Sequence, residues 1–194
     1  LCDMTSIFWR RNAVWASVMA ISLSLAALLS SGCQREVWDS NPDHDLRFSA
    51  DTLFFDTVFA TVGSVTLPLK VYNDHEGSLL IDEIELASGV ASQYRINVDG
   101  TPITNLSQPY RDKVLHAGDS MYVFVEVTVD PEQSAGDSPF WVIEALRFLT
   151  NGNEQEVTLV ARGQNARFYG DPNEIAIDLC DEVWTPDLPY VIYG

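Results

Sequence analysis

The side chains with the widest range of chemistry in this chain are three histidines, His44, His75 and His116. They are far apart in sequence, in segments that we expect to be loops. None has a second histidine or a cysteine at the spacing of a zinc site, so we predict surface histidines and no metal site. The carboxylates near His44 could be imagined as metal ligands, but a solvated linker explains them better.

The sequence signatures of hydrolytic and nucleotide-binding chemistry are also missing. There is no Gly-x-Ser-x-Gly nucleophile elbow, no Gly-x-Gly-x-x-Gly loop and no Walker sequence. Two carboxylates at the right separation could hydrolyse a glycoside, but no spacing among the 28 acidic residues selects a pair. We therefore predict no catalytic residue and no cofactor. One enzymatic alternative stays open, in which the chain is a fragment whose catalytic domain follows Gly194.

Cys33 is the residue with the clearest chemical context. It follows Ser31 and Gly32, and before them residues 13–29 carry no charge and come after two arginines. A basic start, an apolar middle and small residues before a cleavage point are typical of a secretory leader. As a helix the apolar run would span roughly 26 Å, so an uncleaved transmembrane anchor is an alternative, as is a simple buried helix.

The sequence Ser30-Ser31-Gly32-Cys33 resembles the lipobox of bacterial lipoproteins, with Ser30 where leucine is usual. The resemblance implies that a signal peptidase recognises Ser30, Ser31 and Gly32. It also implies that Cys33 becomes the acylated first residue, so that a lipid attaches the protein to a membrane. Gln34 rather than aspartate follows the cysteine, which implies the outer membrane of a diderm bacterium. Which face of that membrane carries the protein stays open.

Composition limits the kinds of partner. The formal net charge is −17, and nucleic-acid binding needs the opposite sign, so we exclude nucleic acid. The chain has three cysteines, Cys2, Cys33 and Cys180. Leader cleavage would remove the first and lipidation would consume the second. No intramolecular disulfide is then available, and stability must come from packing.

The elements that would position any site are predicted to be strands. Between residues 46 and 169 the apolar period is two, most clearly over residues 120–129. Asn151-Gly152 predicts a type I′ hairpin. A phase slip near Asp82 predicts a bulge, and Pro68 predicts an edge strand because it lacks an amide donor. About seven strands in this length predict an immunoglobulin-like antiparallel β-sandwich, an all-β fold, preceded by a helical signal segment.

Four segments resemble the ASH/HYDIN type of immunoglobulin-like domain, which is related to the PapD-like and major-sperm-protein sandwiches. They are Asp56-Thr57-Val58-Phe59 with the following Val62-Gly63-Ser64, Leu69-Lys70-Val71-Tyr72-Asn73, Leu115-His116-Ala117-Gly118-Asp119-Ser120, and the closing strand at residues 157–163. The resemblance implies a protein-scaffolding or spacer role without catalytic residues. We expect a signal peptide over residues 1–32, a tether over 33–45 and the sandwich over 46–169. Residues 170–194 would be a linker or the start of a truncated further β unit.

Aromatic side chains are the remaining candidates for binding. Tyr122, Phe124 and Trp141 fall on the mixed face of predicted strands, where exposed rings could stack on sugars or anchor a protein. Packing against the sandwich is the alternative. The first hypothesis is therefore a lipid-anchored envelope spacer or protein-interaction module, and the second is a surface module that binds glycan or host protein. The second predicts a coplanar row of exposed aromatic rings.

Overall fold

The computed structural model describes residues 36–60, 62–130, 140–170 and 183–193. The chain divides into two units, residues 1–36 and 37–194, and only the second is largely described. The predicted leader, the lipobox residues Ser30, Ser31, Gly32 and Cys33, and also Cys180, lie outside the described residues. No helix within the described part is long and apolar enough to cross a membrane.

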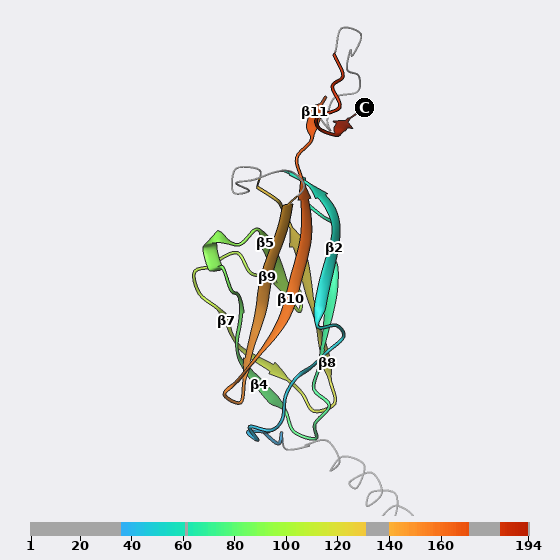
Figure 1. The fold of residues 1–194 in the computed structure, drawn as a ribbon. Helices are drawn as coiled ribbons and strands as arrows, with labels where there is room; N and C mark the ends of the chain where they lie inside the picture. The colour runs from blue at the N-terminus through green and yellow to red at the C-terminus, as the bar shows by residue number, and fades with distance from the viewer. Residues whose placement is uncertain (1–35, 61, 131–139, 171–182, 194) are drawn as a thin grey trace, which may run out of the picture. The chain divides into compact units, whose positions relative to one another are not determined.

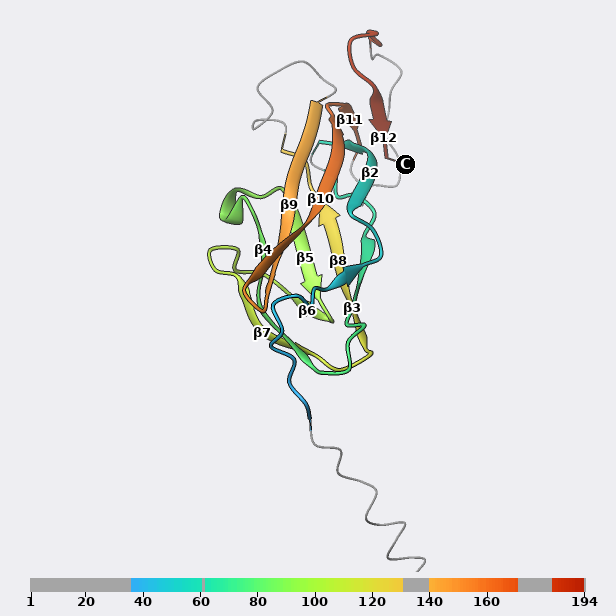
Figure 2. The same cartoon turned by 60° about the horizontal axis from the view of Figure 1, so that its bottom comes forward.

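Two five-stranded sheets make up the body of the second unit (Figures 1 and 2). Sheet 1 has the order β1 (Arg47–Phe48), β3 (Leu67–Tyr72), β8 (Ser120–Val127), β5 (Tyr94–Val98) and β6 (Thr101–Pro102). Sheet 2 has the order β2 (Thr52–Phe59), β10 (Asn153–Gln164), β9 (Phe140–Thr150), β4 (Leu79–Leu86) and β7 (Tyr110–Leu115). A short 3₁₀ helix, η1 (Gly89–Ala91), precedes β5.

The strand order is that of an immunoglobulin-like sandwich. β3, β8 and β5 occupy the places of strands B, E and D, and β4, β9 and β10 those of C, F and G. The predicted all-β, immunoglobulin-like fold is therefore confirmed. Two details differ from the expectation. The described sandwich has ten strands rather than about seven, since the short β1 and β6 and the added β7 extend the sheets. In addition, β2 pairs with β10 in parallel.

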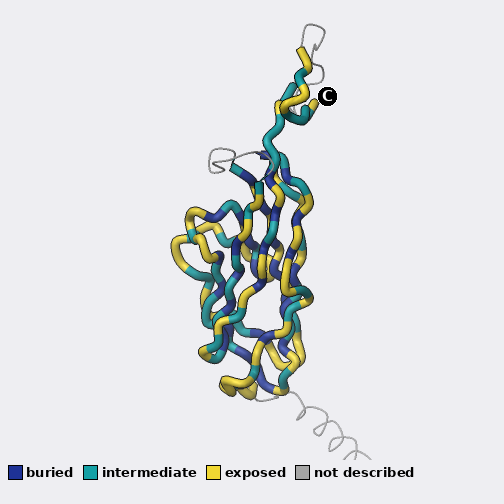
Figure 3. Tube along the Cα trace, viewed as in Figure 1, coloured by how far each residue is buried: buried dark blue, intermediate teal, exposed yellow. Residues whose placement is uncertain are grey.

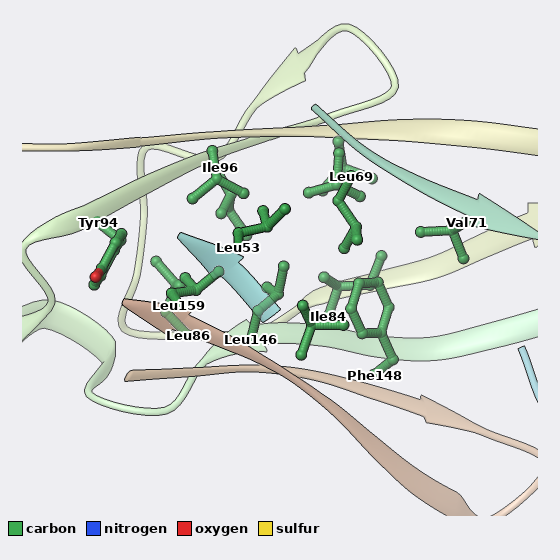
Figure 4. Close-up of a cluster of buried hydrophobic side chains, with 14 of the residues drawn as sticks. Leu53, Leu69, Val71, Ile84, Leu86, Tyr94, Ile96, Leu146, Phe148 and Leu159 are labelled. Atoms are coloured by element: carbon green, nitrogen blue, oxygen red, sulfur yellow. The ribbon is translucent and has the colours of Figure 1, made fainter. Parts of the chain in front are cut away.

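Alternating burial along the strands explains why the two sheets face each other (Figure 3). On β8, Met121, Val123, Val125 and Val127 are buried, while the residues between them face outward. The core joins such side chains from both sheets and includes Leu53, Leu69, Val71, Ile84, Leu86, Tyr94, Ile96, Leu146, Phe148 and Leu159 (Figure 4). Each fully buried aliphatic or phenyl side chain stabilises the fold by about 1.5–3 kcal/mol.

Three local predictions can be compared with the strand pairings. The Asn151-Gly152 turn is confirmed, because both residues have positive φ and connect β9 to β10. The bulge near Asp82 is confirmed by a register shift between Ile81 and Glu83. The edge-strand prediction holds only at the Pro68 end of β3. The β1 strand covers the other end, at Val71 and Tyr72.

The segment before β1 is attached to the sandwich, contrary to the expected tether over residues 33–45. Trp38 forms an isolated parallel bridge with Ser78, in which Ser78 N donates to Val37 O at 2.7 Å and Asp39 N donates to Ser78 O at 2.9 Å. The side-chain amide of Gln155 bonds both the backbone N and the backbone O of Leu46, each at 2.9 Å. We call residues 37–46 the docked segment; it is blue in Figure 1. Backbone groups that solvent would otherwise satisfy are thus paired with the domain.

Near the C-terminus, β11 (Arg167–Tyr169) pairs in parallel with β12 (Tyr190–Ile192). Trp184 packs between them, with its ring 4.5 Å from that of Tyr190 and 5.5 Å from that of Tyr169. β12 lies within residues 170–194, the range expected to be a linker or the start of a further β unit, whereas β11 lies at the end of the range expected for the sandwich.

Candidate binding surface

Tyr122 and Phe124 lie side by side on the outer face of sheet 1. They are two residues apart on β8, so the pleat directs both to the same face. Tyr122 is 45% exposed and Phe124 is 40% exposed, and their rings stack with centroids 5.8 Å apart and planes 19° apart. Two large apolar surfaces are thus held in water next to each other.

Two cations extend this pair across the sheet. Lys70 lies opposite Tyr122 in the β3–β8 register, with Nζ 5.6 Å from the ring centroid of Tyr122 and 4.9 Å from that of Tyr72. The guanidinium of Arg47 lies 3.8 Å from the ring of Tyr72. We call Arg47, Tyr72, Lys70, Tyr122 and Phe124 the aromatic–cation row. Each cation–π contact at an exposed site is worth about 0.5–1 kcal/mol, which favours the orientation of these side chains seen in the structure.

An ion pair fixes the Arg47 end of the aromatic–cation row. Arg47 donates two hydrogen bonds to the Asp74 carboxylate, one of them from Nη2 to Oδ1 at 3.0 Å. These bonds raise the pKa of Arg47 above its ordinary value and lower the pKa of Asp74. Both side chains are exposed, so the pair orients the guanidinium over Tyr72 and adds little to stability.

A groove of about 730 Å³ lies beside Phe124, within the size range of ligand pockets. Its lining combines apolar and polar side chains and comprises Thr66, Arg95, Ile96, Asn97, Pro102, Ile103, Thr104, Phe124 and Glu126. Arg95 donates to the carbonyls of Ser92 at 2.9 Å and Tyr94 at 2.8 Å, which positions its guanidinium. The groove can accept an apolar group against Phe124 and hydrogen-bond a polar one at its rim.

Trp141 is exposed too, at 57%, but it does not belong to this surface. It lies on β9 in sheet 2, where its ring is 6.1 Å from that of Phe54 and near the exposed Ile143. The structure therefore brings together Tyr122 and Phe124 but not Trp141, and the single coplanar row of three aromatic residues is not formed. The physical reason is that β8 and β9 belong to different sheets, whose outer faces point away from each other.

Sequence reasoning missed a second group of side chains, formed by Asp39, His44 and His75. One ligand-capable atom from each lies within 4.8 Å of the other two. Asp39 Oδ2 is 2.6 Å from His44 Nδ1, and the two imidazole rings stack at 4.1 Å with planes 6° apart. The hydrogen bond from His44 is the main cause that lowers the pKa of Asp39, followed by that from the Asn41 backbone. The sequence predicts surface histidines that are far apart in the chain, and no pattern in it indicates this proximity.

The buried Glu144 carboxylate serves the fold. Its two oxygens accept hydrogen bonds from Ser88 N at 2.8 Å and from Ser92 Oγ at 2.7 Å. The nearby Tyr94 hydroxyl donates to Val142 O at 2.8 Å, and burial, together with the charge of Glu144, raises its pKa. Both groups are occupied with holding the connection before β5 against β9.

Comparisons with known proteins find only distant similarity. No family model matches the chain, and no curated protein does. Similar solved structures include a protein of unknown function from Porphyromonas gingivalis, at 11% identity and TM-score 0.44, covering 61% of this chain and 46% of that one. Others are the periplasmic chaperone SfaE (11%, 0.37, 62% and 58%) and an ASH/PapD-like domain of human CEP192 (9%, 0.37, 70% and 94%).

The chain spans less than two thirds of the length of the first two of these structures. At such identities and TM-scores, the likeness carries no argument about activity. The fold assignment therefore rests on the strand order and the shared core of the two sheets.

Proposed function

We propose that this chain is a non-catalytic, lipid-anchored cell-envelope protein whose immunoglobulin-like domain binds another protein through the aromatic–cation row. The observation that carries the proposal is the exposed, stacked pair of Tyr122 and Phe124, continued by Lys70 and bordered by the groove. Aromatic residues and arginine are enriched where proteins bind each other, and they supply most of the binding energy there. On the outer face of sheet 1, neither ring contributes to the core.

Charge favours an extended segment with apolar and acidic side chains as the partner. The chain carries a formal net charge of −17, yet Arg47, Lys70 and Arg95 all lie on the outer face of sheet 1. Arg47 is paired with Asp74, and Arg95 lies opposite Glu126. Lys70, beside the rings of Tyr72 and Tyr122, is therefore the cation best placed to attract an acidic group of a partner. The aromatic rings and the groove would then hold the apolar side chains of the same segment.

The binding experiment places a photo-crosslinking amino acid at position 122 of the full chain in cells and identifies the linked protein. That partner, once purified, is titrated against the wild-type chain and the double variant Tyr122→Ala/Phe124→Ala. If the two rings are hot spots worth at least 2 kcal/mol together, affinity falls by about 30-fold or more. Phe54→Ala/Trp141→Ala, on the other sheet, is the matched control and should bind normally. A spacer role predicts instead that both double variants bind like the wild type.

The anchor has its own test. Metabolic labelling with a fatty-acid analogue should label the wild-type chain and leave Cys33→Ala unlabelled. The variant should also be released from the membrane fraction. An unlabelled wild-type chain would refute acylation while leaving the binding surface untouched.

Glycan binding is the second candidate, favoured by one feature of the groove. Arg95, Asn97 and Glu126 flank the ring of Phe124, which combines a stacking surface with hydrogen-bonding groups as sugar sites do. Titrating the chain with soluble envelope oligosaccharides, followed by NMR, separates the two candidates. Saturable shifts at Phe124 and Asn97 would favour glycan over protein.

A further inference from the structure

Asp39, His44 and His75 converge where the docked segment meets the loop between β3 and β4. Asp39 and His44 come from the docked segment, and His75 comes from the loop. All three side chains are partly buried. Asp39 is more enclosed than His44, with 11% of its side chain exposed against 37%. The cluster shares no residue with the aromatic–cation row or with the groove, although Asp74, the ion-pair partner of Arg47, precedes His75 in the chain.

The backbone around the cluster holds it in place. The backbone N of Asp39 donates a hydrogen bond to the backbone O of Ser78. Gly77 allows the two backbones to come this close, since a Cβ at position 77 would lie 2.9 Å from Asp39 Cβ. His75 is fixed by the hydrogen bond from its backbone N to Asn73 Oδ1 at 3.0 Å. A ligand would therefore find the three residues already assembled, which lowers the conformational cost of binding.

Hydrogen bonds also set which ring nitrogens have lone pairs. His75 Nε2 lies 3.0 Å from the backbone carbonyl of Asp45, which can only accept, so Nε2 carries the proton and Nδ1 has a lone pair. Histidines that bind metals commonly donate their other nitrogen to such a carbonyl. A shared proton joins His44 Nδ1 to Asp39 Oδ2 at 2.6 Å. A metal ion that displaces this proton could bind both atoms.

We propose that Asp39, His44 and His75 bind one divalent transition-metal ion, of which Zn²⁺ is the type, with water completing the coordination. Two imidazoles and one carboxylate form the ligand set of open zinc sites, whereas Ca²⁺ and Mg²⁺ prefer oxygen ligands alone. Tetrahedral Zn²⁺ places its ligand atoms about 3.3 Å from one another. The three ligand atoms already lie within 4.8 Å of one another, so small shifts of the side chains would bring them to that spacing.

The bound ion would act as a clasp. Its coordination bonds would join the docked segment to the β3–β4 loop. Water would compete with these bonds less effectively than it competes with hydrogen bonds. The sandwich and the chain that leads to Cys33 would then be fastened together whenever the metal is present. The metal site joins the docked segment to the β3–β4 loop and does not depend on the proposed partner.

The test uses the full chain purified in detergent and stripped with a chelator. Titration calorimetry with Zn²⁺ should give one site, and Co²⁺ should give the visible absorption of a tetrahedral nitrogen–oxygen site. His44→Ala, His75→Ala and Asp39→Asn should each weaken Zn²⁺ binding by about tenfold or more. His116→Ala, which changes a histidine outside the cluster, should not. Near-ultraviolet cobalt–thiolate bands would place the metal on cysteine and overturn the proposal.

A second readout guards against variants that fold poorly. Zn²⁺ should raise the thermal unfolding temperature of the wild-type chain, because a ligand that binds only the folded state stabilises it. It should also slow proteolysis within residues 37–46. Neither effect should occur in His75→Ala. Weak binding at many carboxylates, unchanged in all three variants, would mean that the cluster is not a metal site.

Discussion

Replacing Asn73 with alanine should lower the free energy of unfolding by about 3 kcal/mol. Asn73 follows β3 and is only 1% exposed. Its side-chain amide nitrogen donates to three carbonyls, those of Gly77 at 2.8 Å, Leu115 at 3.0 Å and His116 at 3.1 Å. Its side-chain oxygen accepts from His75 N at 3.0 Å. One side chain thus joins the β3–β4 loop to the loop between β7 and β8.

The expected loss of about 3 kcal/mol follows from the number of hydrogen bonds that Asn73→Ala would remove. A hydrogen bond contributes about 1 kcal/mol net, and an orphaned buried group costs about 1–3 kcal/mol. The two N–H groups of Asn73 are shared among three acceptors, so the four contacts amount to about three full bonds. A loss of about 3 kcal/mol changes the unfolding equilibrium by roughly a factor of 100, out of a total of about 5–15 kcal/mol for a domain.

Urea unfolding followed by tryptophan fluorescence measures this loss. Asn73→Asp keeps the acceptor for His75 N and removes the donors, so it should lose at least as much stability as alanine. Asn105→Ala is the control, because Asn105 is exposed and its side-chain oxygen accepts hydrogen bonds from Ser107, two residues along the same loop. It should change stability by less than about 0.5 kcal/mol. If Asn73→Ala also stays within that range, the role of Asn73 as the connector of these loops is refuted.

Other predictions concern the core, a turn and the C-terminal sheet. Phe148→Ala should cost about 3–5 kcal/mol in urea unfolding, because its ring is fully buried between the sheets. Gly152→Ala should cost about 1–2 kcal/mol, because φ at this position is +82°. An NMR titration of Asp187 should have its midpoint below 3.8, since hydrogen bonds from Thr185 and then Arg167 lower its pKa. Those contacts stabilise the β11–β12 sheet fully at pH values above the ordinary aspartate pKa, and this stabilisation is lost as the pH falls through the lowered pKa. In Asp187→Asn, the stability of the sheet should no longer change over this pH range.

The sequence predicts individual strands better than their partners. Alternation over residues 120–129 gives β8 and its buried face, and Asn151-Gly152 gives the β9–β10 hairpin, because both signals are local. The parallel pairing of β2 with β10 joins residues about a hundred positions apart. Such a pairing depends on which sheet edge remains free after the others have formed. No local pattern encodes that choice.

The same distinction separates the parts of the candidate sites. Alternation correctly places Tyr122 and Phe124 on the outer face, since it reports which side of a strand a residue occupies. It does not report which sheet the strand joins, and Trp141 was grouped with them for that reason. The contact between His44 and His75 depends on the docking of residues 37–46. A polar, aspartate-rich segment gives no sign of docking, because the bonds that hold it go to backbone groups and distant amides.

Docking of that segment changes what the proposed lipid anchor would do. A tether that extended to residue 45 would let the domain move far from the membrane. Since Val37 and Asp39 already bond Ser78, only the residues between Cys33 and Val37 are left to span the distance. These three residues give four Cα-to-Cα steps from Cys33 to Val37, which reach at most about 14 Å even when fully extended. An acyl group on Cys33 would therefore keep the docked segment close to the lipid surface. A metal ion on Asp39, His44 and His75 would prevent this segment from detaching from the sandwich and so lengthening the connection to the membrane. A partner of the aromatic–cation row would then be a protein of the same membrane surface, or one that approaches it closely.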